Sequence, residues 1–196
     1  MKVNVKQIYG NWDLGFALDK HKISSTFTGN NEWGRPTFDT LRTEAGEATF
    51  QLKYRQDWTQ AAVLAKAVQV SILPRLGKVG IIIPMAASTE RPRQPVSEVA
   101  SELSKLIGEP SFDNLLLKAK GGKSLKDLTT KQEKLDQIAQ AGFSIACPDP
   151  IGNEGRWNVL LLDDLFDTGA STESAVTALR THPKLGQIFV AALTWK

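Results

Sequence analysis

The sequence predicts an α/β fold, a doubly wound and mainly parallel sheet with a small N-terminal β-rich appendage. Three observations predict it. Residues 79–83 and 157–162 are short apolar runs of the kind found in strands buried on both faces of a parallel sheet. Segments with apolar residues at helical spacing alternate with these runs. The first 50 residues are instead polar and rich in turn signals, which favours a hairpin or small meander.

The expected elements follow this pattern in order. Residues 23–27 and 37–41 predict short strands within an appendage of residues 1–47, and residues 48–196 form the main domain. Pro74 and Gly77 end the first helix of that domain, and Gly108 ends the second. The expected elements of the domain are a strand at 48–54, a helix at 58–73, a strand at 79–83, a helix at 96–107, a strand at 112–117, a helix at 135–141, a strand at 157–162, a helix at 171–179 and a strand at 188–193.

Composition excludes several classes of protein. A chain of 196 residues is too short for two full domains. Its 24 Lys and Arg against 21 Asp and Glu leave a net charge of +3, so we do not expect a nucleic-acid partner. Cys147 is the only cysteine, which excludes an intramolecular disulfide and a multi-thiolate zinc site. The apolar run at 79–87 is far below the roughly 20 residues that span a bilayer, so we expect a cytoplasmic protein without a membrane partner.

One segment carries the chemistry. The apolar strand at 157–162 ends in Asp163 and Asp164, and a loop containing Asp167, Thr168 and Gly169 then leads into a helix. Ligands of open α/β sheets bind beyond the carboxyl ends of the strands. A glycine allows close backbone approach, and the first N–H groups of a helix favour an anion such as phosphate. The paired acids suit a ribose diol or Mg²⁺. Together they describe a sugar-phosphate site.

This segment resembles the phosphoribosyl-pyrophosphate (PRPP) motif of type I phosphoribosyltransferases, with strand, two acids, loop and helix in the required order. The segment 81–86, with Arg91, Arg93 and a helix after it, is similar to the ComF-like branch of amidophosphoribosyltransferase-like proteins. The stretch 51–54 also looks like that branch. The resemblance covers roughly residues 46 to 196, and it implies the type I phosphoribosyltransferase fold.

The resemblance also implies roles for individual residues. Asp163 and Asp164 would hold the ribose hydroxyls and Mg²⁺, and Asp167 would act as a base toward the incoming nitrogen. The implied activity is a Mg²⁺-dependent transfer of the 5-phosphoribosyl group from PRPP to an unidentified nitrogen acceptor, with release of pyrophosphate. Homodimers are usual among such relatives. The implied PRPP-binding residues are Asp163, Asp164, Asp167, Thr168, Gly169, Ala170, Ser171 and Thr172, and the implied pyrophosphate loop is Pro84, Met85, Ala86, Ala87 and Ser88.

The sequence departs from the family pattern in two places. No cysteine precedes Cys147, so the N-terminal zinc module common in ComF-type proteins is missing. The loop 84–88 also lacks the Arg or Lys that many type I enzymes place against pyrophosphate. Arg91, Arg93 and Lys123, the last in a lysine-rich stretch at 118–134, are therefore the candidate catalytic cations.

Other interpretations stay open at this stage. The chain could bind PRPP or a nucleotide without transfer, as a sensor or as a partner in a DNA-related process. The acidic segment could be a strand-to-helix turn with an acidic surface, and Asp167 could cap the helix instead of serving as a base. The lysine-rich stretch could be a solvated loop or a hood over pyrophosphate. We expect His21 and His182 to be surface or turn residues, since neither has a partner at metal-ligand spacing.

Overall fold

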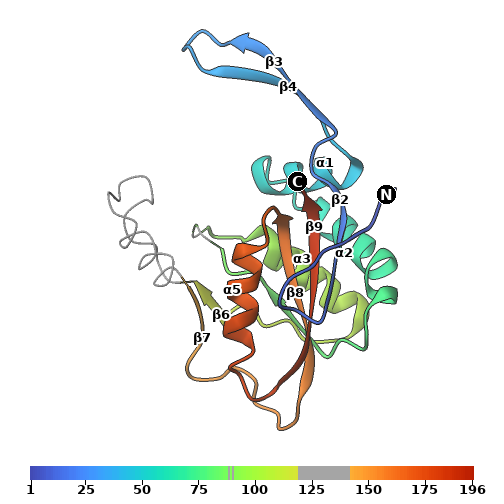
Figure 1. Cartoon of the computed structure of the whole chain (residues 1–196), viewed down its shortest axis with the longest axis vertical. Helices are drawn as coiled ribbons and strands as arrows, with labels where there is room; N and C mark the ends of the chain where they lie inside the picture. Colours follow the sequence, from blue (N-terminus) through green and yellow to red (C-terminus); the bar gives the residue numbers. More distant parts are fainter. Residues whose placement is uncertain (88, 90, 119–141) are drawn as a thin grey trace.

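A five-stranded sheet forms the centre of the computed structural model, which describes residues 1–87, 89, 91–118 and 142–196 (Figure 1). Its strand order is β1-β2-β9-β8-β5, and only the two-residue β1 runs antiparallel to its neighbour. The sheet is therefore mainly parallel, as expected. Its strands are β1 (Lys6–Gln7), β2 (Leu14–Lys20), β5 (Ile81–Pro84), β8 (Trp157–Phe166) and β9 (Leu185–Trp195).

Helices cover both faces of this sheet. The helices α1 (Glu44–Tyr54), α2 (Thr59–Ser71) and α3 (Pro95–Ile107) pack on one face, and a 3₁₀ turn (Leu73–Arg75) follows α2. The opposite face is covered by α5 (Ala170–Leu179) and by a two-stranded sheet of β6 (Leu116–Lys118) and β7 (Phe143–Ile145). This arrangement confirms the doubly wound α/β fold.

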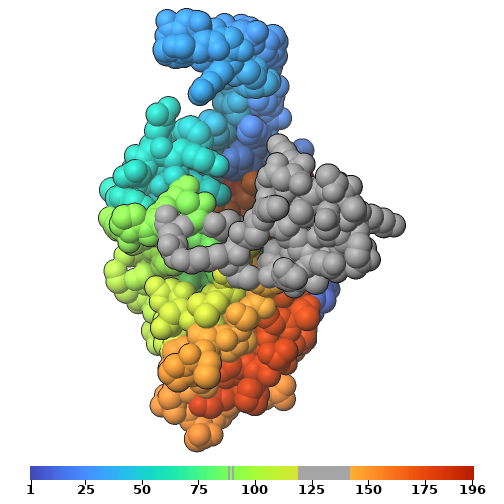
Figure 2. Space-filling view, turned by 90° about the vertical axis from the view of Figure 1, so that its left-hand side faces the viewer, coloured from blue at the N-terminus to red at the C-terminus, as the bar shows by residue number. Residues whose placement is uncertain are grey.

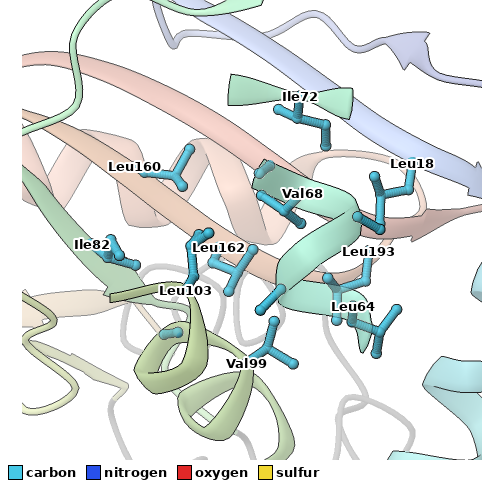
Figure 3. Close-up of a cluster of buried hydrophobic side chains, with 14 of the residues drawn as sticks. Leu18, Leu64, Val68, Ile72, Ile82, Val99, Leu103, Leu160, Leu162 and Leu193 are labelled. Atoms are coloured by element: carbon cyan, nitrogen blue, oxygen red, sulfur yellow. The ribbon is translucent and has the colours of Figure 1, made fainter. Parts of the chain in front are cut away.

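The apolar runs of the sequence become the core because β8 has neighbours on both sides and helices on both faces. Leu160 and Leu162 point to the α2 and α3 side, where they meet Val68 and Leu103 (Figure 3). Leu161 points the other way, into the layer under α5. All three leucines are fully buried. Truncating one of them to alanine typically costs about 2–5 kcal/mol of stability, so the strand that carries the acidic pair is firmly anchored.

The strand expected at 48–54 is wrong, because these residues belong to helix α1. Thr43 caps the helix, since its hydroxyl accepts the N–H of Gly46 at 2.9 Å. Ala45, Ala48 and Leu52 are buried on one side of α1 at spacings of three and four residues. A seven-residue window also fits an alternating pattern, and that ambiguity misled the sequence prediction. The helix brings Lys53 to the carboxyl end of the sheet, as described below.

The N-terminal segment contributes both to the sheet and to a separate hairpin. β3 (Ser24–Asn30) and β4 (Pro36–Leu41) form an antiparallel pair, as expected for a hairpin. Figures 1 and 2 show it standing away from the body of the molecule. β2, however, pairs with β9 inside the central sheet. The sheet thus draws strands from both sides of residue 47, and the division into domains there stays a prediction.

The remaining expected elements have mixed outcomes. The helices at 58–73, 96–107 and 171–179 are present as α2, α3 and α5, with Gly108 in a left-handed conformation after α3. The strand expected at 112–117 is reduced to β6, outside the central sheet. The expected helix at 135–141 lies outside the described residues. In the part of the chain that the structure describes, no helix has the length and apolarity needed to cross a membrane.

Candidate functional site

Asp163 and Asp164 lie where β8 extends beyond the end of its neighbour β5. β5 stops at Pro84, opposite Leu162, whereas β8 continues to Phe166 along β9. Asp163 and Asp164 therefore extend past the end of β5. The sequence predicted that the strand would end at residue 162, and the structure makes it four residues longer. Asp163 and Asp164 are thus fixed by sheet pairing and not carried on a loose loop.

A cavity of about 280 Å³ opens beside this strand end. Asp163, Asp164 and Leu165 line one side of it, and Ser171 of α5 also contributes. The loop after β5 lines it as well, and α1 contributes Lys53. The cavity thus collects residues from segments far apart in the sequence, at the sheet edge where ligands of open α/β folds bind.

The two carboxyl groups have different surroundings. Burial, followed by the nearby charge of Asp164, raises the pKa of Asp163 to about 7. Asp163 also accepts the backbone N–H of Asp164 at 2.8 Å. Asp164 instead pairs with Lys53, whose Nζ lies 2.5 Å from its Oδ2. Asp163 is therefore present in both its neutral and its charged form near neutral pH. Asp164 is ion-paired with Lys53.

His21 joins this network through a buried threonine. The Thr194 hydroxyl donates to the backbone carbonyl of Asp164 at 2.8 Å, and His21 Nδ1 lies 3.2 Å from the same hydroxyl oxygen. Because the single proton of Thr194 is used on the carbonyl, Nδ1 of His21 is the donor in their contact. Burial, followed by the charge of Arg42, lowers the pKa of His21. His21 is thus a neutral ring beside the acidic pair, a placement that its spacing in the sequence does not indicate.

The loop after β8 contains the residues that the sequence predicted to bind phosphate. Asp167 and Thr168 are exposed, and Gly169 adopts a φ of 86° directly before α5. A side chain at Gly169 would be strained at this φ, and its Cβ would lie 3.2 Å from the ring of Phe166. Trp12 supports the loop from behind through an edge contact with Phe166, at 6.0 Å between ring centroids. The first-turn N–H groups of Ala170, Ser171 and Thr172 follow immediately.

Asp167 and the predicted cations occupy distinct environments. Asp167 pairs with Lys196 at 2.7 Å on the surface. Arg91 lines the cavity and donates to the backbone carbonyl of Lys53 at 3.2 Å. Arg93 pairs instead with Glu98, at 2.5 and 3.0 Å, and lies over the ring of Trp58. Lys123 lies outside the described residues.

The loop after β5 is placed against the same cavity. Pro84 is the last residue of β5, and Met85, Ala86 and Ala87 line the cavity, while Ser88 lies outside the described residues. Lys118, at the end of β6, also lines it. Lys53 was not among the predicted catalytic cations, and its segment was expected to be a strand. Only the fold reveals that Lys53 lies beside Asp164, 111 positions later in the chain.

The acidic pair suits Mg²⁺ only together with a ligand. Among the residues described, no group of three or more His, Cys, Asp or Glu side chains is arranged to hold a metal ion. Mg²⁺ usually keeps several waters and binds one or two carboxylates together with substrate phosphates. Asp163 and Asp164 therefore fit a metal that arrives with a phosphorylated substrate.

Comparison with known proteins gives a fold and no sequence family. No protein-family model matches the chain, and a search of the curated proteins found no match. Among solved structures, adenine phosphoribosyl transferase from Trypanosoma brucei, in complex with AMP, pyrophosphate and ribose-5-phosphate, superposes with a TM-score of 0.50 at 9% identity. That alignment covers 98% of this chain and 74% of the other.

Two further solved structures are similar at lower TM-scores. Orotate phosphoribosyltransferase from Aeropyrum pernix is 15% identical, with 84% of this chain and 74% of that chain covered and a TM-score of 0.39. UMP synthase from Leishmania donovani is 14% identical, with a TM-score of 0.38. That alignment covers 84% of this chain, which spans only 27% of the length of the synthase. The similarity to the Trypanosoma enzyme, together with the strand order of the sheet, shows that the chain has the type I phosphoribosyltransferase fold.

Proposed function

We propose that this chain binds PRPP together with Mg²⁺ and transfers its phosphoribosyl group to a nitrogen acceptor, releasing pyrophosphate. One observation carries the proposal: the acidic pair near the end of β8 and Ser171 in the first turn of α5 line the same open cavity, and the Asp167–Gly169 turn joins these two elements along the chain. This is the arrangement that a phosphorylated ribose needs, with amides for its phosphate and carboxylates for its diol. The fold shared with the Trypanosoma enzyme supports the same chemistry.

The proposed roles follow from position. The 5-phosphate would accept hydrogen bonds from the N–H groups of residues 168–172, while Asp163 and Asp164 would hold the ribose hydroxyls. The same two carboxylates would hold Mg²⁺, which supplies positive charge against the leaving pyrophosphate when it is bound. Met85, Ala86 and Ala87 would contact the pyrophosphate through their backbone.

The proposed reaction breaks the bond between ribose C1 and the pyrophosphate oxygen and forms a bond from C1 to nitrogen. The electron pair of the broken bond leaves with pyrophosphate, and the nitrogen loses a proton. Positive charge develops on the sugar ring in the transition state, as in glycoside cleavage. Asp167 is the proposed acceptor of the proton. Arg91, Arg93 and Lys123 remain the proposed catalytic cations.

We also place the chain in the ComF-like branch of the fold as part of this proposal. The support is the sequence resemblance of segments 51–54 and 81–86 to that branch, and Lys53, Met85 and Ala86 of these segments line the cavity.

Titration calorimetry and a transfer assay test the proposal. We expect PRPP to bind in the presence of Mg²⁺, and incubation with a panel of purine and pyrimidine bases to release pyrophosphate with at least one of them. Absence of PRPP binding would contradict the whole proposal. Binding without pyrophosphate release from any base would contradict the transfer step and leave a binding protein.

A further inference from the structure

The loop after β5 supplies no positive charge to balance the negative charge of the proposed ligand. The pyrophosphate group of the proposed ligand carries several negative charges, yet Pro84, Met85, Ala86 and Ala87 offer no cationic side chain. The acidic pair that also lines the cavity offers no positive charge either. A cation supplied by another element is therefore needed.

Lys53 forms an ion pair with the acidic pair, through Asp164. It comes from the last turn of α1 and lines the cavity together with Arg91 and Lys118. Its Nζ lies 2.5 Å from Asp164 Oδ2, and the side chains of Lys53 and Asp164 are 29% and 20% exposed. An ion pair shielded to this degree is screened less by solvent and salt than a pair on an open surface.

The backbone at Lys53 is held while its side chain can turn. Arg91 donates to the Lys53 carbonyl, which ties the end of α1 to the segment after the β5 loop. The lysine side chain has a flexible four-carbon stem, and its ammonium group has three hydrogen-bond donors. Asp164 is fixed more firmly, because β8 pairs with β9 and Thr194 donates to its carbonyl. Of the two partners, Lys53 is the one that can move.

Ligand binding at Asp164 competes with this ion pair. A ribose diol or a metal ion at Asp164 takes the carboxylate oxygen that Lys53 now occupies. The released ammonium would remain beside the same cavity, because Lys53 lines it, and could there pair with a phosphate group of the ligand. Each charge keeps a partner before and after the exchange, which avoids the large cost of leaving a part-buried charge alone.

We propose that Lys53 is a pyrophosphate-binding residue that exchanges Asp164 for the ligand when PRPP binds. This inference rests on the proposed function and adds to it the source of charge that the β5 loop lacks. It also predicts that loss of Lys53 weakens only ligands that carry pyrophosphate, because Lys53 contacts that group and competes with any ligand that needs Asp164.

Calorimetric titration of Lys53→Met with three probes tests the exchange. The probes are PRPP, inorganic pyrophosphate and ribose 5-phosphate, each with Mg²⁺. We expect the affinity for PRPP and pyrophosphate to fall about 10- to 100-fold, the range for one hydrogen bond to a charged group. Affinity for ribose 5-phosphate should stay unchanged or increase, since its competitor at Asp164 is gone. Lys53→Arg should restore most of the loss.

The control is Lys66→Met, at an exposed lysine of α2 that contacts Gln69. It should bind all three probes as the wild type does. Unchanged pyrophosphate and PRPP affinity in Lys53→Met would overturn the inference, and so would an equal loss for all three probes, which would indicate a structural role. If the wild-type chain binds none of the probes, the proposed function itself fails.

Discussion

The two loops at the carboxyl end of the sheet differ in almost every physical property. The loop after β8 contains Asp167, Thr168 and Gly169 and leads directly into a helix, with an aromatic pair behind it. The loop after β5 begins Pro-Met-Ala-Ala and has no charged side chain in those four positions. In the proposed complex, the first loop would hold the sugar phosphate, whereas the second would offer only backbone groups and would need positive charge from α1 and from the segment around Arg91. The proposal thus assigns sugar-phosphate binding and charge neutralisation to different parts of the chain.

Removing the acids beside the first loop should have the largest effect. We expect Asp163→Asn combined with Asp164→Asn to weaken PRPP binding by more than about 100-fold, because two hydrogen bonds to charged groups are lost. Calorimetry in Mg²⁺ measures this, and thermal unfolding checks that the variant folds. Glu102→Gln, at a surface residue paired with Lys105, is the matched control. If the double variant bound PRPP as tightly as the wild type does, the PRPP site could not lie at the acidic pair.

Stability against pH should reveal the raised pKa of Asp163. An unfolded chain titrates its aspartates near 3.9, whereas the pKa of Asp163 in the folded chain is about 7. The folded chain therefore retains a proton that the unfolded chain has lost, and this contribution is full below about pH 4 and disappears as pH rises through 7. Urea unfolding of wild type and Asp163→Asn should show the variant gaining in relative stability over that window. If the stabilities of the two proteins changed in parallel over this pH range, the raised pKa of Asp163 would be contradicted.

The backbone of the first loop should tolerate no side chain at Gly169. Gly169→Val places a branched residue at a φ of 86° against Phe166, which should cost about 1–3 kcal/mol of stability and weaken ribose 5-phosphate binding about tenfold. Gly152→Val is the control, because a Cβ there meets nothing within 4 Å. We expect that control to change stability by less than about 0.5 kcal/mol. Equal effects of the two substitutions would show that the loop is not tightly built.

The two arginines after the second loop should differ in importance. Arg91→Met should weaken PRPP binding about tenfold, because Arg91 lines the cavity and holds the Lys53 carbonyl. Arg93→Met should have a smaller effect, about threefold, since Glu98 and Trp58 already engage that guanidinium. Calorimetry of both variants ranks them. The reverse order would place the pyrophosphate on the Arg93 side of the loop.

The same contrast explains what the sequence could predict. The loop after β8 was predictable because strand, acids, glycine and helix are contiguous, so local chemistry determines the local structure. The role of Lys53 was not, since its contact with Asp164 joins positions 111 residues apart. The pairing of β2 with β9 was missed for a similar reason, because Gly15 and Asp19 weaken the strand pattern and the partner strand is remote. The helix α1 was missed because a short window fits two periodicities.

A crystal structure of the chain with PRPP and Mg²⁺ tests the central claim most directly. We predict that the 5-phosphate lies against the N–H groups of residues 168–172, that the ribose hydroxyls face Asp163 and Asp164, and that Lys53 has left Asp164 for the pyrophosphate. Density for the sugar phosphate anywhere else, or an intact Lys53 to Asp164 pair beside a bound ligand, would contradict the account.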